Sequence, residues 1–221
     1  RNLDRNIGRV LVELKAQGLD QNTLVIFTSD NGGAHYIGLD DLNKPYRGWK
    51  ATFFEGGTRV PFFMQLPGVI APGSQFTAPV SHFDIFATSA ALAGVQPPAD
   101  RVIDGVNLIP FARGEQGGRP HEQMFWRSGA YQVARSGDWK LQVNETQDKV
   151  WLFNLKDDPT EQHNLVDAEP ARVKELLAQL AEFNSQQKAP LWPSLVEAPI
   201  LIDKPLNRPQ TIDDEFIYWS N

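Results

Sequence analysis

Two short segments of this sequence combine residue types that bind cations and anions. Asp30 and Asn31 begin the segment Asp-Asn-Gly-Gly, and carboxylate and amide oxygens are ligands of hard cations such as Ca²⁺ and Mg²⁺. Lys50 ends the segment Arg-Gly-Trp-Lys, and a lysine ammonium can bind an oxyanion or stabilise a departing oxygen. His35 lies in the loop between them, and loops carry many binding residues. On residue type, Asp30 and Asn31 are therefore candidate metal ligands, Lys50 is a candidate catalytic and substrate-binding residue, and His35 is a candidate substrate-binding residue.

Each segment also has a simpler interpretation. The residues of Asp-Asn-Gly-Gly are those that dominate turns, and Lys50 taken alone is typical of an ordinary surface lysine. Glu55 and Arg59 lie close to the start of a predicted strand. We expect them to form a buried ion pair that fixes the loop rather than to perform chemistry.

The elements that must position these residues follow an α/β pattern. Apolar residues recur at helical spacing over residues 3–14, and the helix is expected to end near Gly18. The apolar run at 23–28 is typical of a strand buried on both faces of a parallel sheet. Asp30 would then lie at the carboxyl end of that strand, where ligands bind in open α/β sheets. Further predicted elements are a strand over 58–65 and a helix over 80–94.

The second half of the sequence has a different pattern. Short apolar runs are separated by Gly, Asp and Asn, which predicts an antiparallel meander. Its four strands are predicted at 123–126, 131–135, 139–143 and 150–154. An amphipathic helix is expected over 170–187, and the proline-rich tail over 189–221 is expected to be irregular.

The composition excludes several classes of protein. The 221 residues carry a formal net charge of -6 and contain no block of basic residues, so we expect no nucleic-acid partner, which would need clustered Lys and Arg. Cysteine is absent, which excludes disulfide scaffolds and thiolate zinc sites in this stretch. No apolar run approaches the roughly 20 residues of a membrane span, so no membrane partner is expected.

Three motifs, in this order and at this spacing, resemble the sulfatase family. They are Ser29-Asp-Asn-Gly-Gly33, Arg47-Gly-Trp-Lys50 and Glu55-Gly-Gly-Thr-Arg-Val-Pro61. Trp139-Lys-Leu141 and Asp158-Pro-Thr-Glu161 resemble later landmarks of the same family. The resemblance implies the fold class α/β. Residues 1–122 would be the C-terminal portion of an alkaline-phosphatase-like core, and residues 123–221 a small antiparallel α+β subdomain.

The resemblance also implies an activity, the hydrolysis of sulfate esters on a sulfated small molecule or glycan. Asp30 and Asn31 match the family's calcium ligands, which would bind Ca²⁺, or Mg²⁺ as the alternative, together with acidic residues from a more N-terminal part. Lys50 matches the lysine that contacts the sulfate group and stabilises the leaving oxygen. Phosphate shares the tetrahedral geometry of sulfate, so a phosphomonoester or phosphonate hydrolase of the same superfamily stays an alternative.

One family feature is absent from the sequence. Sulfatases generate a formylglycine nucleophile from a Cys/Ser-x-Pro-x-Arg motif, and this sequence contains neither Cys nor Ser-x-Pro-x-Arg. Because the sequence also begins inside the predicted helix, we expect it to be the C-terminal part of a longer protein. The formylglycine would then lie in a missing N-terminal half, which is the expected partner. A non-catalytic fragment is the remaining alternative, and a periplasmic or secreted location of the full-length protein stays open.

Overall fold

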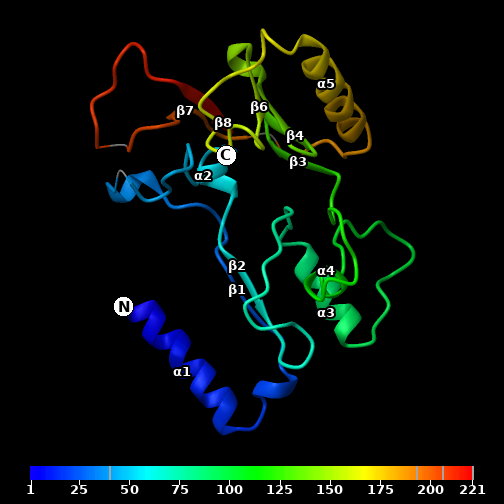
Figure 1. The fold of residues 1–221 in the computed structure, drawn as a ribbon. Helices are drawn as coiled ribbons and strands as arrows, with labels where there is room; N and C mark the ends of the chain where they lie inside the picture. The colour runs from blue at the N-terminus through cyan, green and yellow to red at the C-terminus, as the bar shows by residue number, and fades with distance from the viewer. Residues whose placement is uncertain (40, 193, 206, 221) are drawn as a thin grey trace. The chain divides into compact units, whose positions relative to one another are not determined.

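The computed structural model describes residues 1–39, 41–192, 194–205 and 207–220. The chain divides into two compact units. The first unit comprises residues 1–28 and 62–121, and the second comprises residues 29–61 and 122–221. Segment 29–61 holds the residues predicted to bind a metal and an anion, and it belongs to the unit that contains the C-terminal sheet. The sequence had suggested that this segment belongs with the rest of residues 1–122. Figure 1 labels the elements of both units.

The first unit contains three α-helices, one 3-10 turn and one strand pair among its described residues. Its elements are α1 (Asn2–Ala16), the 3-10 turn Asp20–Asn22, β1 (Val25–Thr28), β2 (Phe62–Gln65), α3 (Asp84–Leu92) and α4 (Ile109–Ala112). The helix predicted to end near Gly18 is confirmed as α1, which ends before Gly18, whose positive φ of 68° suits a glycine. The helix predicted over 80–94 is shorter than expected, because α3 starts only at Asp84 and ends at Leu92. The predicted strand over 58–65 starts only after Pro61, because residues 55–58 form a short helix instead.

The expectation of a parallel, fully buried strand at 23–28 is wrong. β1 pairs with β2 in an antiparallel two-stranded sheet, in which Phe27 lies opposite Phe63. These two phenylalanines contact each other at 6.1 Å between ring centroids, and both are exposed. A short apolar run is compatible with either strand direction, because the direction depends on the partner and not on the run itself.

The second unit is built on a four-stranded antiparallel sheet. Its strands run in the order β3 (Gln123–Ser128), β4 (Tyr131–Ser136), β5 (Trp139–Asn144) and β6 (Lys149–Asn154). The predicted meander is confirmed with shifts of one or two residues. Tight turns centred on Gly129 and Gly137, both with positive φ, join the first three strands.

The two faces of this sheet pack against different elements. Ala134, Leu141 and Leu152 lie opposite one another on one face and pack against Leu176 and Leu180 of α5 (Pro170–Ser185). Val133, Gln142 and Trp151 alternate with them and point to the other face. That second face carries a core of aromatic and β-branched residues that also includes Phe54, Ile202 and Ile217.

The C-terminal tail forms a strand pair, which corrects the expectation of irregular structure. β7 (Glu197–Leu201) pairs antiparallel with β8 (Phe216–Ser220), and both are coloured orange to red in Figure 1. The prolines that suggested an irregular tail lie mostly outside the strands. Pro199 is the exception and lies within β7, which is an edge strand of a two-stranded sheet and can accept a proline.

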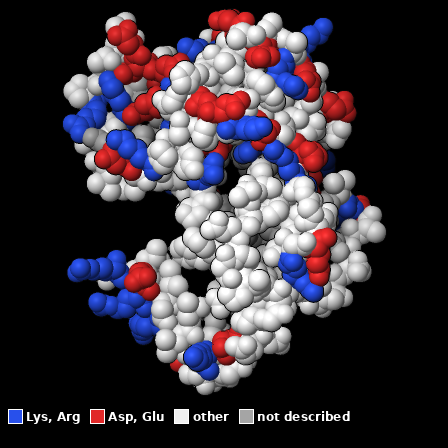
Figure 2. Space-filling view, viewed as in Figure 1, with Lys and Arg blue, Asp and Glu red and all other residues white. Residues whose placement is uncertain are grey.

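The surface agrees with the acidic composition. On the face in Figure 2, Lys and Arg alternate with Asp and Glu over the second unit, whereas the region around β1 and β2 of the first unit carries few charges. Several Lys and Arg side chains gather over α1, at the lower left of this face. Among the described residues, none of the helices combines the length and the apolar character that a membrane span requires.

Candidate active site

The Asp-Asn-Gly-Gly turn packs backbone to backbone against the segment that begins with Glu55. The Gly32 N–H donates to the Gly57 carbonyl at 2.9 Å. A Cβ atom added at Gly32 would lie 1.8 Å from the Gly56 carbonyl oxygen, which is far inside van der Waals contact. The glycines of the two motifs are therefore required by the close approach of the two chains.

A single asparagine fastens this turn to the loop that carries Lys50. The Gly33 N–H donates to Asn43 Oδ1 at 2.7 Å, and Asn43 Nδ2 donates to the carbonyls of Gly33 and Gly48 at 2.9 and 3.2 Å. The Lys50 N–H also donates to the Gly33 carbonyl, at 3.2 Å. We call residues 43–54 the Lys50 loop. The two predicted motifs are thus brought together by hydrogen bonds, and Asn43, which no motif singled out, makes most of them.

The Lys50 side chain is exposed and lies beside a tyrosine. Lys50 Nζ is 3.2 Å from the Tyr36 hydroxyl and 5.7 Å from the centre of its ring. Tyr36 is itself 55% exposed. The arrangement presents an ammonium group and a phenol hydroxyl to solvent side by side, and both can donate hydrogen bonds to an oxyanion.

Asp30 and Asn31 present oxygens that suit a hard cation. The Asp30 side chain is exposed, and Asn31 Nδ2 donates to the Gly32 carbonyl at 2.8 Å. Because the amide nitrogen is used in this bond, the amide oxygen is the atom left to face a ligand. Ca²⁺ takes six to eight oxygens, and the part of the chain that the structure describes holds no group of three or more His, Asp or Glu placed to bind a metal. Two residues supply fewer oxygens than Ca²⁺ takes, and the metal-binding role of Asp30 and Asn31 stays a prediction.

His35 lies under the loop surface. Its side chain is buried and stacks on Trp49, with 5.2 Å between ring centroids and 16° between the ring planes. Trp49 is also buried. The substrate-binding role of His35 stays a prediction, and the exposed group next to Lys50 is Tyr36.

Glu55 belongs to a buried charge cluster rather than to a simple pair with Arg59. Its carboxylate is 2.8 Å from Lys140 Nζ, and Lys140 Nζ is 3.0 Å from Glu161. All three side chains are at most 4% exposed. Arg59 lies 3.8 Å from Glu55 and is half-exposed, with its guanidinium over the Tyr46 ring. The expected structural role of Glu55 agrees with this burial, but its main partner comes from β5.

The charge cluster fixes the end of the Lys50 loop. The Glu55 N–H donates to Glu161 Oε2 at 2.5 Å, and the Phe53 N–H donates to the Tyr131 hydroxyl at 2.9 Å. Tyr131 in turn donates to Gln142, which donates to Glu161. Side chains of the sheet and of the turn at Glu161 thus hold the backbone N–H groups of Phe53 and Glu55, on either side of the last residue of the loop.

The two carboxyl groups of the charge cluster differ in their pKa values. Burial by itself raises the pKa of Glu55, but the attraction and hydrogen bond of Lys140 outweigh it and leave this pKa below its usual value. Burial raises the pKa of Glu161, and Lys140 offsets this only in part, while the nearby charge of Glu55 raises it further. Burial also raises the pKa of Tyr131 well above its usual value, so this phenol stays protonated as a donor.

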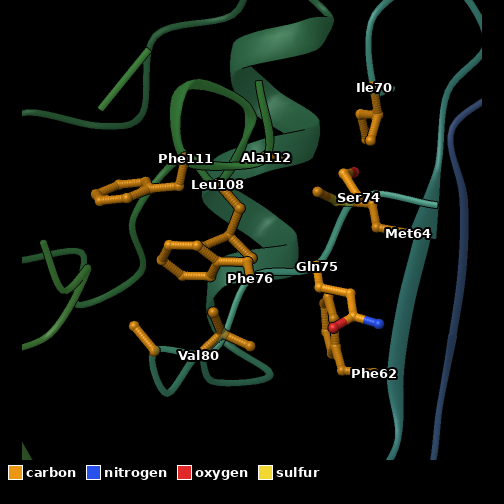
Figure 3. Close-up of a pocket in the computed structure, with 11 residues that line it drawn as sticks. Phe62, Met64, Ile70, Ser74, Gln75, Phe76, Val80, Leu108, Phe111 and Ala112 are labelled. Carbon is orange, nitrogen blue, oxygen red and sulfur yellow. The ribbon is translucent and has the colours of Figure 1, made fainter. Parts of the chain in front are cut away.

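The first unit contains an apolar cavity that holds none of the predicted site residues. Its volume is about 180 Å³, and Figure 3 shows aromatic and aliphatic side chains pointing into it, with Ser74 and Gln75 at its side. Phe62 and Met64 come from β2, and Leu108 and Phe111 come from the region of α4. The chemistry predicted from the sequence therefore lies in the second unit and not at this cavity.

Comparison with known proteins links the geometry to a family. Residues 1–95 match the family described as Sulfatase. The steryl-sulfatase of Rattus norvegicus is 40% identical over 164 residues, which cover 71% of this chain and 28% of that protein.

Three solved structures align with most of this chain. The structure of Ps i-CgsB in complex with k-i-k-neocarrahexaose aligns with a TM-score of 0.76 at 30% identity, over 86% of this chain and 42% of that one. BT4656, in complex with its substrate D-glucosamine-2-N,6-O-disulfate, aligns with a TM-score of 0.65 at 27% identity, over 83% and 38%. The phosphonate monoester hydrolase of Agrobacterium radiobacter aligns with a TM-score of 0.64 at 26% identity, over 83% and 39%. The chain spans less than half of each of these proteins.

Proposed function

We infer that this chain, which belongs to the sulfatase family, supplies part of the site at which a sulfate ester is hydrolysed. The observation that carries the inference is the attachment of Lys50 to the Asp-Asn-Gly-Gly turn through the Gly33 carbonyl. This bond and the Asn43 clamp hold the anion-binding residue and the two metal ligands on one connected piece of backbone. A site for a metal-bound oxyanion needs that proximity.

We assign Lys50 the role of stabilising negative charge. As a sulfate ester bond breaks, charge grows on the sulfate and on the leaving oxygen, and a fixed ammonium lowers the energy of that state. Tyr36 orients the ammonium through its hydroxyl, 3.2 Å away. The exposure of both side chains supports a role at a surface that a substrate can reach.

We assign Asp30 and Asn31 to a calcium site, completed by oxygens from outside this sequence. The bound cation would supply positive charge to the sulfate group. Asp30 would contribute its carboxylate and Asn31 its amide oxygen. The formylglycine nucleophile also lies outside these 221 residues in this proposal, because the sequence contains no motif that could generate it.

The substrate class that we propose is a sulfated sugar. The support comes from the solved relatives, of which BT4656 is described with a disulfated glucosamine as its substrate. A phosphonate monoester hydrolase is the second candidate, because a protein of that activity aligns over 83% of this chain. The groups that Lys50 would contact both carry one negative charge but differ in the substituents on the central atom, and substrate profiling separates the two candidates.

The test is Lys50→Ala in the full-length protein that contains this chain, assayed with an aryl sulfate and with an aryl phosphonate ester. Loss of one preorganised donor should lower kcat about 10²- to 10³-fold. Lys50→Arg should restore only part of the rate, since a planar guanidinium does not replace a compact ammonium. Lys44→Ala, an exposed lysine in the same loop, is the matched control. A kcat of Lys50→Ala equal to that of the control would contradict the proposal, and faster turnover of the phosphonate would favour the second candidate.

A further inference from the structure

Arg47 connects the Lys50 loop to the C-terminal strand pair. Its guanidinium is only 10% exposed, and Nε donates to both carboxylate oxygens of Asp203 at 2.9 and 3.0 Å. The same guanidinium forms a second ion pair with Glu215. Asp203 lies just after β7 and Glu215 just before β8, which are 156 and 168 residues further along the chain. One loop arginine thus binds both sides of the β7–β8 connection.

Trp49 makes a second link between the same two elements. Its indole Nε1 donates to the Leu201 carbonyl in β7 at 2.7 Å. The Trp49 ring stacks on His35 and meets the edge of Tyr36, at centroid distances of 5.2 and 6.2 Å. The Tyr36 hydroxyl is the direct neighbour of Lys50 Nζ. The Tyr36 ring therefore packs against a tryptophan that is hydrogen-bonded to β7.

The strand pair is itself fixed on the central sheet. Ile202 and Ile217 are fully buried in the core that includes Trp151, and the Trp151 indole donates to Glu215 at 3.2 Å. The Glu215 carboxylate therefore receives hydrogen bonds from the sheet on one oxygen and from Arg47 on the other. This geometry makes the C-terminal strand pair a rigid support for the loop residues on the amino side of Lys50.

We propose that Asp203 and Glu215 are positioning residues for Lys50, which act through Arg47 to hold the ammonium where a sulfate oxygen is bound. The proposal rests on the proposed function, in which Lys50 contacts sulfate. Lys50 has an exposed, flexible side chain, so the precision of its ammonium depends on the backbone that carries it. A displacement of about 1 Å at a reacting centre can cost about 10²-fold in rate.

A purely stabilising role for the two ion pairs has a different consequence. If the ion pairs only stabilised the fold, their removal would lower the free energy of unfolding and leave the folded protein with its normal kcat. Asp203 and Glu215 are 49% and 36% exposed, so their neutral amide variants are expected to fold, unlike variants of the buried Arg47. The variant to test is therefore Asp203→Asn combined with Glu215→Gln. Asp213→Asn is the matched control, because Asp213 is exposed and lines the same cavity of about 270 Å³ as Asp203 and Glu215.

Hydrogen exchange in the full chain tests the link without any assay of activity. The Lys50 N–H and the Trp49 indole N–H are both hydrogen-bonded, and NMR can follow their exchange individually. In the double variant both should exchange about tenfold faster or more, because local opening becomes easier when charged anchors are lost. Asp213→Asn should leave both rates within about twofold. Unchanged exchange in the double variant would overturn the proposal.

Kinetics of the full-length protein test the consequence for the reaction. The double variant should lose about 10- to 10²-fold in kcat with little change in KM, because the misplaced ammonium weakens an interaction made in the transition state. A kcat equal to that of Asp213→Asn would overturn the positioning role. The Lys50→Ala experiment decides the proposed function separately, and the exchange measurement does not depend on its outcome.

Discussion

Lys140→Met would remove the positive charge from the buried cluster that ends the Lys50 loop. Lys140 is 1% exposed and lies within 3.0 Å of both Glu55 and Glu161. Methionine is unbranched and apolar, so it can occupy part of the lysine's volume on β5 without its charge. The variant leaves two buried carboxyl groups next to each other, and the nearest remaining cations, Arg59 and Arg135, lie 3.8 and 3.9 Å from Glu55.

The expected loss of stability is large. Removing one partner of a buried ion pair typically costs about 3–5 kcal/mol, because a buried charge is left uncompensated. Here two carboxylates lose the same partner, so we expect the upper part of that range, about 4–5 kcal/mol at pH 8. Domains are stable by only about 5–15 kcal/mol. The second unit of Lys140→Met should therefore be close to unfolding at neutral pH.

The loss should shrink in acid. In the wild type the pKa of Glu55 is lowered, so its contribution to stability is present above its unfolded pKa and disappears as the pH falls through the folded pKa. The pKa of Glu161 is raised, so its contribution is present below its unfolded pKa and disappears as the pH rises through the folded pKa. Without Lys140 both folded pKa values rise. Both carboxyls then protonate more readily as the pH approaches about 4.3, the usual value for glutamate, and the neutral forms need no cation.

Urea unfolding followed by tryptophan fluorescence, at pH 8 and at pH 5, measures this difference. Lys174→Met is the control, because Lys174 is exposed on α5 and surface substitutions usually stay within about 0.5 kcal/mol. Glu55→Gln and Glu161→Gln added to Lys140→Met should recover much of the loss at pH 8, since no buried charge then remains. A cost below about 1 kcal/mol at pH 8, far under the expected range, or a cost that grows in acid, would refute the reasoning.

Two further predictions concern the turn and its metal. Asp30→Ala in the full-length protein should abolish tight Ca²⁺ binding measured by calorimetry, because a carboxylate ligand is lost. Asp41→Ala, at an exposed aspartate between the two motifs, should not. Tight binding that survives Asp30→Ala would contradict the metal assignment. Gly32→Ala should destabilise the second unit in thermal unfolding, because its methyl group would lie 1.8 Å from the Gly56 carbonyl oxygen. The control is Gly8→Ala in α1, whose methyl group meets nothing within 4 Å. This control should stabilise the helix by about 1 kcal/mol. Equal effects of the two alanine substitutions would show that the glycine contact is not needed.

Local patterns in the sequence predicted a large part of the fold. The four strands of the meander and the helix at 170–185 were predicted within about two residues of their observed bounds, because alternation and helical spacing report which face of an element is buried. Residue types and the family resemblance together named Asp30, Asn31 and Lys50 as the candidates for ion binding, and these assignments stay predictions.

Pairing partners were not predictable in the same way. The apolar run at 23–28 gave no sign that its partner would be antiparallel, and the tail gave no sign that Glu197–Leu201 would pair with Phe216–Ser220. Glu55 was expected to pair with Arg59, four residues away, and is held instead by Lys140, 85 residues away. Side chains of equal charge look alike in a sequence, and the choice among them depends on which one is brought near and buried.

The sequence by itself determined which residues could bind a cation and an oxyanion and which segments could form helices or strands. Only the tertiary structure decided that Asn43 joins the two motifs, that Lys140 stands between two buried glutamates, and that Asp203 and Glu215 reach Arg47 from the far end of the chain. The physical reason is that propensity and periodicity act over neighbouring residues, whereas ion pairs and close backbone contacts form between segments that the packing of the sheet brings together.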